Sequence, residues 1–181
     1  MRMTCVVSVV VALVLFVAAP GQEKAENPFK DAKVGDYLTY KMTMSLMGKD
    51  HEANMKQTVV AKSDKEVIVK SVTTPSKGES KPHKIDLTKP YDPVAAFLSE
   101  DKDAKFAKGG EGEEKVKVGD KTYECHWIAG KVTSSFGDVK LEADVKMWIS
   151  KSVPLSGMVK LEAKGDQVNM RFELTGSGHE K

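Results

Sequence analysis

Cys125 and His126 are adjacent, and both are residue types that bind metals or act in catalysis. The surrounding segment "KTYECHWI" alternates apolar and polar residues, which predicts a β-strand. Neighbouring residues on a strand point to opposite faces, so this pair cannot hold one ion together. We therefore predict that Cys125 is a buried thiol between Tyr123 and Trp127. The four histidines show no ligand spacing, and we predict no metal site: His51, His83, His126 and His179.

Sequence motifs for catalysis are also missing. The chain contains no Gly-x-Ser-x-Gly, no His-Glu-x-x-His and no phosphate-binding loop. The glycine-rich stretch "KGGEGEEK" at 108–115 is acidic and does not connect a predicted strand to a predicted helix. No carboxylate stands in an apolar setting that would raise its pKa toward a catalytic value. We predict that the protein is not an enzyme and uses no cofactor.

The methionines are the other residues that suggest binding. Methionine fills irregular volumes and adapts to varied apolar ligands. Six methionines of the predicted strands either fill a core or form a pliable lining: Met42, Met44, Met55, Met147, Met158 and Met170. No Met-x-x-Met cluster with histidine favours copper. The candidate lining of an apolar site is Met42, Met44, Met147, Met170, Phe172 and Trp127.

Alternating apolar and polar residues predict the elements that would position these side chains. The predicted strands are 37–47, 55–62, 66–74, 84–87, 114–133 with a turn at Gly119-Asp120, 137–150, 155–164 and 168–175. The segment 48–54 is predicted as a turn. Asp92 as cap, Pro93 at the first position and an apolar stripe predict one short helix near 93–100. Residues 101–114 lose periodicity and are predicted to be a flexible loop.

The pentapeptide "VKLEA" occurs at 139–143 and again at 159–163. Both copies place Val, Leu and Ala on one strand face, so we interpret them as consecutive strands of one antiparallel meander. Proline has no N–H for a ladder, so we expect Pro154 in the turn and Leu141 opposite Ala163. A shorter turn would instead place Leu141 opposite Leu161 and would pair opposite charges.

The N-terminus has the layout of a secretory signal peptide, with Arg2, an apolar run and then Gly21 before a polar segment. Cleavage after residue 21 would leave Gln22 first, no membrane span and only one cysteine. The protein is then extracytoplasmic, either periplasmic or secreted. Net charge is +2 and the two arginines form no patch, which argues against nucleic-acid binding.

These features predict a mainly β protein with one curved antiparallel sheet, a meander or half-barrel. The expected organisation is a signal peptide at 1–21, an irregular lead at 22–33, a single β domain at 34–176 and a tail at 177–181. One face of the sheet should stay in water, while the other is covered by curling or by the helix.

Three segments resemble a group of exported bacterial β-rich proteins. The segment "VGDYLTYKM" from Val34 matches their opening strand, "VGDKTYEC" from Val118 matches an inner strand, and "MWISKSVPLSG" from Met147 matches their Trp-x-Ser-x-x-Val-Pro-Leu-x-Gly turn. At fold level the group is similar to the lipoprotein-carrier (LolA/LolB-like) half-barrels. The resemblance implies a concave face that holds acyl chains, although the arginines of those carriers have no counterpart on the predicted inner face here.

Two functions follow as hypotheses. The first is a non-enzymatic binding protein whose concave face takes a lipid or another hydrophobic small molecule. The second is a structural or protein-interaction module of the envelope with a filled core. The sequence identifies no protein partner. An open void beside the candidate residues would favour the first hypothesis, and contact between them and the helix would favour the second.

Overall fold

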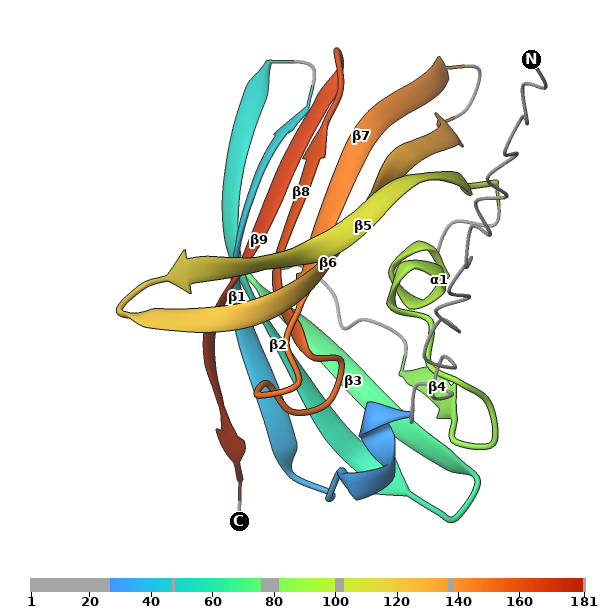
Figure 1. Cartoon of the computed structure of the whole chain (residues 1–181), viewed down its shortest axis with the longest axis vertical. Helices are drawn as coiled ribbons and strands as arrows, with labels where there is room; N and C mark the ends of the chain where they lie inside the picture. The colour runs from blue at the N-terminus through green and yellow to red at the C-terminus, as the bar shows by residue number, and fades with distance from the viewer. Residues whose placement is uncertain (1–26, 47, 76–81, 100–102, 137–138, 181) are drawn as a thin grey trace, which may run out of the picture.

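The strands of the protein form one strongly curved antiparallel sheet (Figure 1). The computed structural model describes residues 27–46, 48–75, 82–99, 103–136 and 139–180. The nine strands lie in the order β4-β3-β2-β1-β9-β8-β7-β6-β5. Their bounds are β1 Asp36–Leu46, β2 Lys49–Lys62, β3 Glu66–Thr74, β4 His83–Asp86, β5 Lys105–Val118, β6 Lys121–Phe136, β7 Val139–Ile149, β8 Met158–Lys164 and β9 Val168–His179. The predicted mainly β fold is confirmed. The predicted signal peptide at 1–21 lies outside the described residues.

The helix α1, Pro93–Leu98, connects the two edge strands β4 and β5 and lies on the concave side of the sheet (Figure 1). The Asp92 carboxylate accepts hydrogen bonds from the N–H groups of Val94 at 2.9 Å and Ala95 at 3.0 Å. Pro93 occupies the first turn, where its missing N–H costs nothing. The prediction of a short helix in this region is confirmed.

The hydrophobic core lies on the concave side of the sheet, between the strands and the segments that cover them, including α1. The β1 residues Leu38 and Tyr40 are both fully buried, as the alternation in β1 predicts. The Tyr40 hydroxyl donates to the carbonyl of Met158 at 3.2 Å, so its polar end is satisfied. Burial raises the pKa of this phenol far above its usual value, and the tyrosine stays neutral.

The lead before β1 is more ordered than its composition predicts. It forms a 3₁₀ helix, Pro28–Asp31, and Phe29 within it is buried. The Asn27 side chain accepts from the Phe29 N–H, and its amide donates to the carbonyls of Asp86 and Lys89, each at 3.1 Å. These bonds fasten the lead to the end of β4, so the prediction of an irregular lead is wrong for this part.

The predicted flexible loop at 101–114 is wrong from Lys105 onward, because β5 occupies this stretch and pairs with β6 along its length. The glycines that suggested a loop instead make room for an aromatic ring. A Cβ atom on Gly112 would lie 2.9 Å from the indole of Trp127, which faces it from β6. Glycine in a strand interior often marks such close approach.

Two further boundaries differ from the prediction. The segment 48–54 is not a turn: β2 begins at Lys49 and pairs with β1 from there, although its first residues are polar. The segment 177–181 is not a free tail, because β9 continues to His179 opposite Asp36. The imidazole Nδ1 of His179 lies 2.9 Å from the Asp36 carboxylate.

The two "VKLEA" copies lie on neighbouring antiparallel strands, β7 and β8, as interpreted from the repeat. Their register, however, differs from both alternatives. Val145, not Leu141, lies opposite Ala163, and Met147 lies opposite Leu161. The pairing predicted from the proline is therefore wrong by four residues, 145 against 141.

The cause is a connection at 150–157 that packs as part of the core. The Ser150 N–H donates to the carbonyl of Gly157 at 2.8 Å and closes the loop. Val153 and Leu155 are both buried beneath it. Pro154 lies in the loop, as expected, but the loop is longer than turn chemistry alone predicts.

Candidate functional site

Two neighbouring rows of side chains cross the inner, concave face of the sheet. Residues directly opposite one another on paired strands share a face, so the strand register defines each row. The first row, from β1 to β6, is Met42, Phe172, Leu161, Met147 and Ile128. The second row, in the same strand order, is Met44, Met170, Ala163, Val145 and Gly130. Five of the six predicted lining residues lie in these two rows.

The two rows differ in their exposure. In the first row Met147 is 1% exposed and Phe172 is 7% exposed, so both belong to the core. In the second row Ala163 and Val145 are likewise buried, but Met44 on β1 and Met170 on β9 are both partly exposed. The apolar face therefore continues beyond the packed core, and the methionines of the second row reach solvent.

The helix α1 covers the first row through an aromatic contact. The rings of Phe97 and Phe172 meet edge to face, with centroids 6.2 Å apart. No residue of α1 is fully buried. A helix of one and a half turns has little stability of its own, so this contact and its caps hold it in place.

Trp127, the sixth predicted lining residue, lies on the outer face. It is directly opposite Trp148, while its neighbour Ile128 is opposite the inner-facing Met147. The Nζ atom of Lys146 lies 4.5 Å from the centroid of the Trp127 ring and 4.7 Å from that of Trp148. Trp127 is therefore separated from the other five candidates by the sheet itself.

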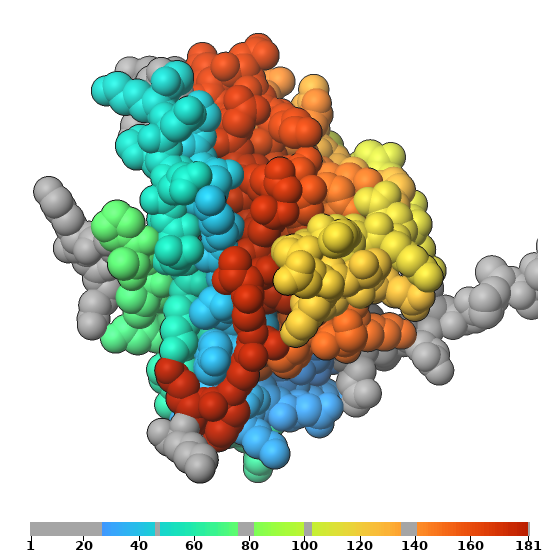
Figure 2. All heavy atoms as spheres, turned by 90° about the vertical axis from the view of Figure 1, so that its left-hand side faces the viewer, coloured from blue at the N-terminus to red at the C-terminus, as the bar shows by residue number. Residues whose placement is uncertain are grey.

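Trp127 and Trp148 form a cluster with the charged side chains of Lys146 and Glu114, called the tryptophan cluster below. The Trp148 indole N–H donates to the Glu114 carboxylate, and the Lys146 ammonium lies 3.0 Å from the same oxygen. These two hydrogen bonds hold the pKa of Glu114 below its usual value. Trp148 is only 6% exposed although it lies on the outer face, because Glu114 of the β5–β6 hairpin and the side chains of Lys146 and Lys160 lie against it. Figure 2 shows the tip of this hairpin beside β9.

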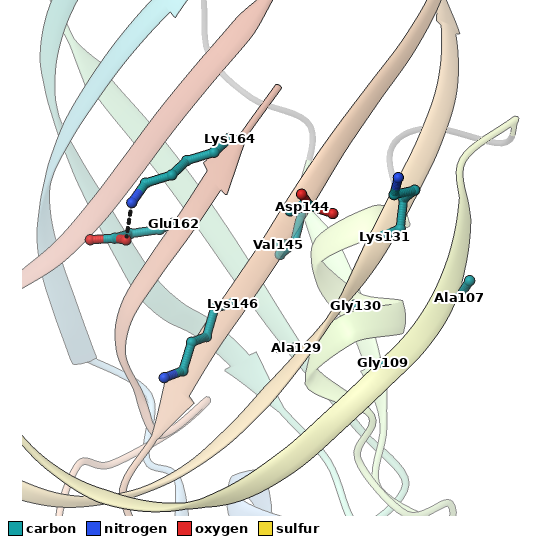
Figure 3. A pocket seen from close by; sticks show the side chains of 10 residues that line it. All are labelled: Ala107, Gly109, Ala129, Gly130, Lys131, Asp144, Val145, Lys146, Glu162 and Lys164. Atoms are coloured by element: carbon teal, nitrogen blue, oxygen red, sulfur yellow. Dashed lines mark ion pairs between the residues drawn. The ribbon is translucent and has the colours of Figure 1, made fainter. Parts of the chain in front are cut away.

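Two hollows of the described surface lie away from the candidate residues. The larger is on the outer face and has a volume of about 610 Å³ (Figure 3). Its floor is made of small residues, and its rim carries charged side chains: Lys131, Asp144, Lys146, Glu162 and Lys164. The second, of about 340 Å³, lies beside β3 and β4 and is lined by charged and polar residues. Neither hollow is lined by any of the six predicted residues.

Cys125 is buried, at 3% exposure, as predicted. Burial raises the pKa of its thiol, and the negative charge of Glu114 raises it further. His126 points away from it, with Nε2 3.4 Å from the Glu111 carboxylate. Among the described residues, no three His, Cys, Asp or Glu side chains are grouped to bind a metal. Nor does that part of the chain contain a helix long and apolar enough to cross a membrane.

One residue at the end of the second row was missed from the sequence. His51 on β2 lies directly opposite Met44 and shares its face. The polar composition of 48–54 predicts a turn, and a strand prediction therefore stops short of His51. Counting back in steps of two from Met55 through Ala53 would have placed His51 beside the methionines.

Among solved structures, the fold is similar to that of a protein from Bacteroides fragilis described as exported and YmcC-like. The two share 9% identity and a TM-score of 0.52 over 81% of this chain and 96% of that one. This likeness supports the half-barrel architecture. Two further similar structures are a lipoprotein from Parabacteroides distasonis (13% identity, TM-score 0.48, 85% and 99% covered) and a LolA superfamily protein from Nitrosomonas europaea (6%, 0.29, 86% and 91%). No protein-family model and no curated protein matches the sequence.

Proposed function

We propose that the protein is an exported, non-enzymatic binding protein that takes a lipid-like hydrophobic ligand on the inner face of its sheet. The observation that carries this proposal is the second row, where Met44 and Met170 face each other and are partly exposed. This end of the row is a partly exposed apolar surface beside the core, and exposed apolar patches often mark binding sites. The apolar N-terminal segment supports export.

Met42, Met147 and Phe172 form the floor of this site, under α1. The Phe97 contact lies over Phe172, and α1 has no buried residue that would fix it more firmly. A ligand would therefore enter beside Met44 and Met170, whose flexible side chains adapt to its shape. Trp127 plays no part in the site.

The alternative, an envelope module with a filled core, is favoured by the complete burial of Met147 and by hollows that lie elsewhere. The two functions make different predictions for a neutral fluorescent apolar probe. We expect 1-N-phenylnaphthylamine to bind the purified exported protein with a saturable rise in fluorescence.

Met170→Asp places a charge in the second row and should abolish this rise. Asn169→Asp adds the same charge one residue away, on the exposed outer face, and should leave it unchanged. Absence of binding to the unmodified protein, or equal behaviour of the two folded variants, would favour the filled-core module. Mass spectrometry of organic extracts of the protein identifies a co-purified ligand.

A further inference from the structure

Around the two rows, the charged side chain on the inner face of β1, β2, β3, β7, β8 and β9 is positive. In the described parts of these strands that carry or adjoin the two rows, the inner positions hold no carboxylate, whereas the inner carboxylate Asp36 lies at the far end of β1, opposite His179. The charged or titratable residues of these parts, other than Tyr40, are Lys49 and His51, both on β2. Lys62 is also on the inner face, but it lies at the far end of β2, opposite Val67, and donates to the carbonyl of Ala32. The outer positions carry the carboxylates instead, among them Glu52, Glu162 and Glu173.

Lys49 and His51 stand at the end of the apolar row where Met44 and Met170 are partly exposed. His51 is directly opposite Met44, which is directly opposite Met170 on the next strand. Lys49 is two residues before His51 and shares its face. Both side chains are exposed, so a ligand can reach them. The inner face thus joins an apolar row to a positive end.

The dimensions of this row suit one long chain. From β2 to β6 the row crosses five strand spacings, which is about 24 Å at roughly 4.8 Å each. At its far end a Cβ on Gly130 would lie 2.5 Å from the ring of Phe106, so this ring covers the glycine. Between these ends the row is apolar. Ala163 and Val145 lie beside the two methionines on the neighbouring strands and are buried, at 4% and 6% exposure, so a chain bound along the row would displace the side chains that cover them.

We propose that the inner face binds a long-chain fatty acid, with its chain along the second row and its carboxylate beside Lys49 and His51. The lysine provides a charge, and the imidazole provides an N–H donor in either protonation state. A carboxylate fits better than a phosphate ester, because arginine is the residue that grips phosphate with two parallel hydrogen bonds. The arginine of the described chain, Arg171, lies on the outer face and is paired with Glu173.

This inference rests on the proposed binding function, and the experiment separates the two. The probe 1-N-phenylnaphthylamine is bound to the purified exported protein and displaced by palmitate, methyl palmitate, hexadecyl phosphate or hexadecylamine. We expect palmitate to displace it best, with an advantage over the methyl ester of about fivefold, the size of an exposed ion pair. The advantage should shrink in 1 M salt, where charges are screened.

The double variant Lys49→Gln/His51→Gln should lose the preference for palmitate over the ester while still binding the ester. A matched control, Lys41→Gln/Lys164→Gln, removes two positive charges from the outer face and should keep the preference. Equal displacement by acid and ester, or a preference unchanged in the inner-face variant, overturns the fatty-acid assignment but not apolar binding. Stronger displacement by hexadecyl phosphate or hexadecylamine also overturns it. Failure of the probe to bind overturns the proposed function itself.

Discussion

Phe97 of α1 contacts Phe172 of β9 edge to face, and this pair joins the helix to the floor of the inner face. Because Phe97 is only partly buried, we expect Phe97→Ala to lower the free energy of unfolding by about 1–2 kcal/mol, less than a fully buried Phe→Ala. Phe172→Ala should cost about 3–5 kcal/mol. Urea denaturation of both variants measures this difference. Equal losses would mean that α1 is held as firmly as the core.

Met147→Asp should destabilise the protein by about 4 kcal/mol or more, because it places an unpaired charge in the core. Met147 is 1% exposed and lies opposite Leu161. The control is Asn169→Asp, at an exposed position on the outer face, which should change stability by less than about 0.5 kcal/mol. Similar denaturation midpoints for the two variants would contradict the assignment of faces.

Lys146→Asp should be destabilising although Lys146 is on the outer face. From the sequence alone, strand alternation predicts a loss below about 1 kcal/mol. In the structure Lys146 lies over both tryptophan rings and pairs with Glu114, so aspartate loses these contacts and repels that carboxylate. We expect a loss of about 1–2 kcal/mol. Lys151→Asp, in the exposed part of the β7–β8 loop, is the control and should be nearly neutral.

Stability should fall in acid partly because of Glu162. Its carboxylate lies 2.7 Å from the Lys160 ammonium and 3.2 Å from that of Lys164, and these contacts lower its pKa. A lowered pKa stabilises the folded state at neutral pH, and this contribution disappears as pH falls through roughly 4.3 and below. We expect the free energy of unfolding to fall less steeply from about pH 5 to about pH 3 in Glu162→Gln than in the unmodified protein, by under about 1 kcal/mol. Identical slopes would show that the contacts add nothing in solution.

Cys125 should react slowly with a thiol reagent in the folded protein and rapidly after denaturation. It is buried, and its raised pKa reduces the reactive thiolate. Ellman's reagent with and without urea measures both rates. Rapid labelling of the folded state would mean that the β5–β6 hairpin opens over the tryptophan cluster.

The elements with strong alternation were predictable from the sequence, and so were the faces of their residues. The inner positions of Met42, Met44, Met147 and Met170 follow from a period of two, and sheet register then brings them into rows. The helix was predicted from Asp92 as its N-cap. In the structure the Asp92 carboxylate accepts hydrogen bonds from N–H groups of the first turn, which is how an N-cap stabilises a helix.

The remaining features depend on partners far away in the sequence. Gly112 has the composition of a loop, and only the indole of Trp127 across the strand explains its place in β5. The register of β7 and β8 depends on Val153 and Leu155, which are buried in a loop whose length no local rule specifies. Trp127 was assigned to the lining from its residue type, whereas its face depends on its pairing with Trp148.

The pairing of the first strand, β1, with the last, β9, makes the chain suitable for circular permutation. The Glu180 N–H donates to the Gly35 carbonyl at 2.9 Å, so the two ends of the sheet domain lie together. A linker from the end of β9 to the start of the lead at Asn27, with a new opening between α1 and β5, would give a circular permutant with strand order β5-β6-β7-β8-β9-β1-β2-β3-β4. Every hydrogen-bonded strand pair would then also be consecutive in sequence. Because contact order falls when paired strands are sequence neighbours, we expect this permutant to fold faster than the natural chain.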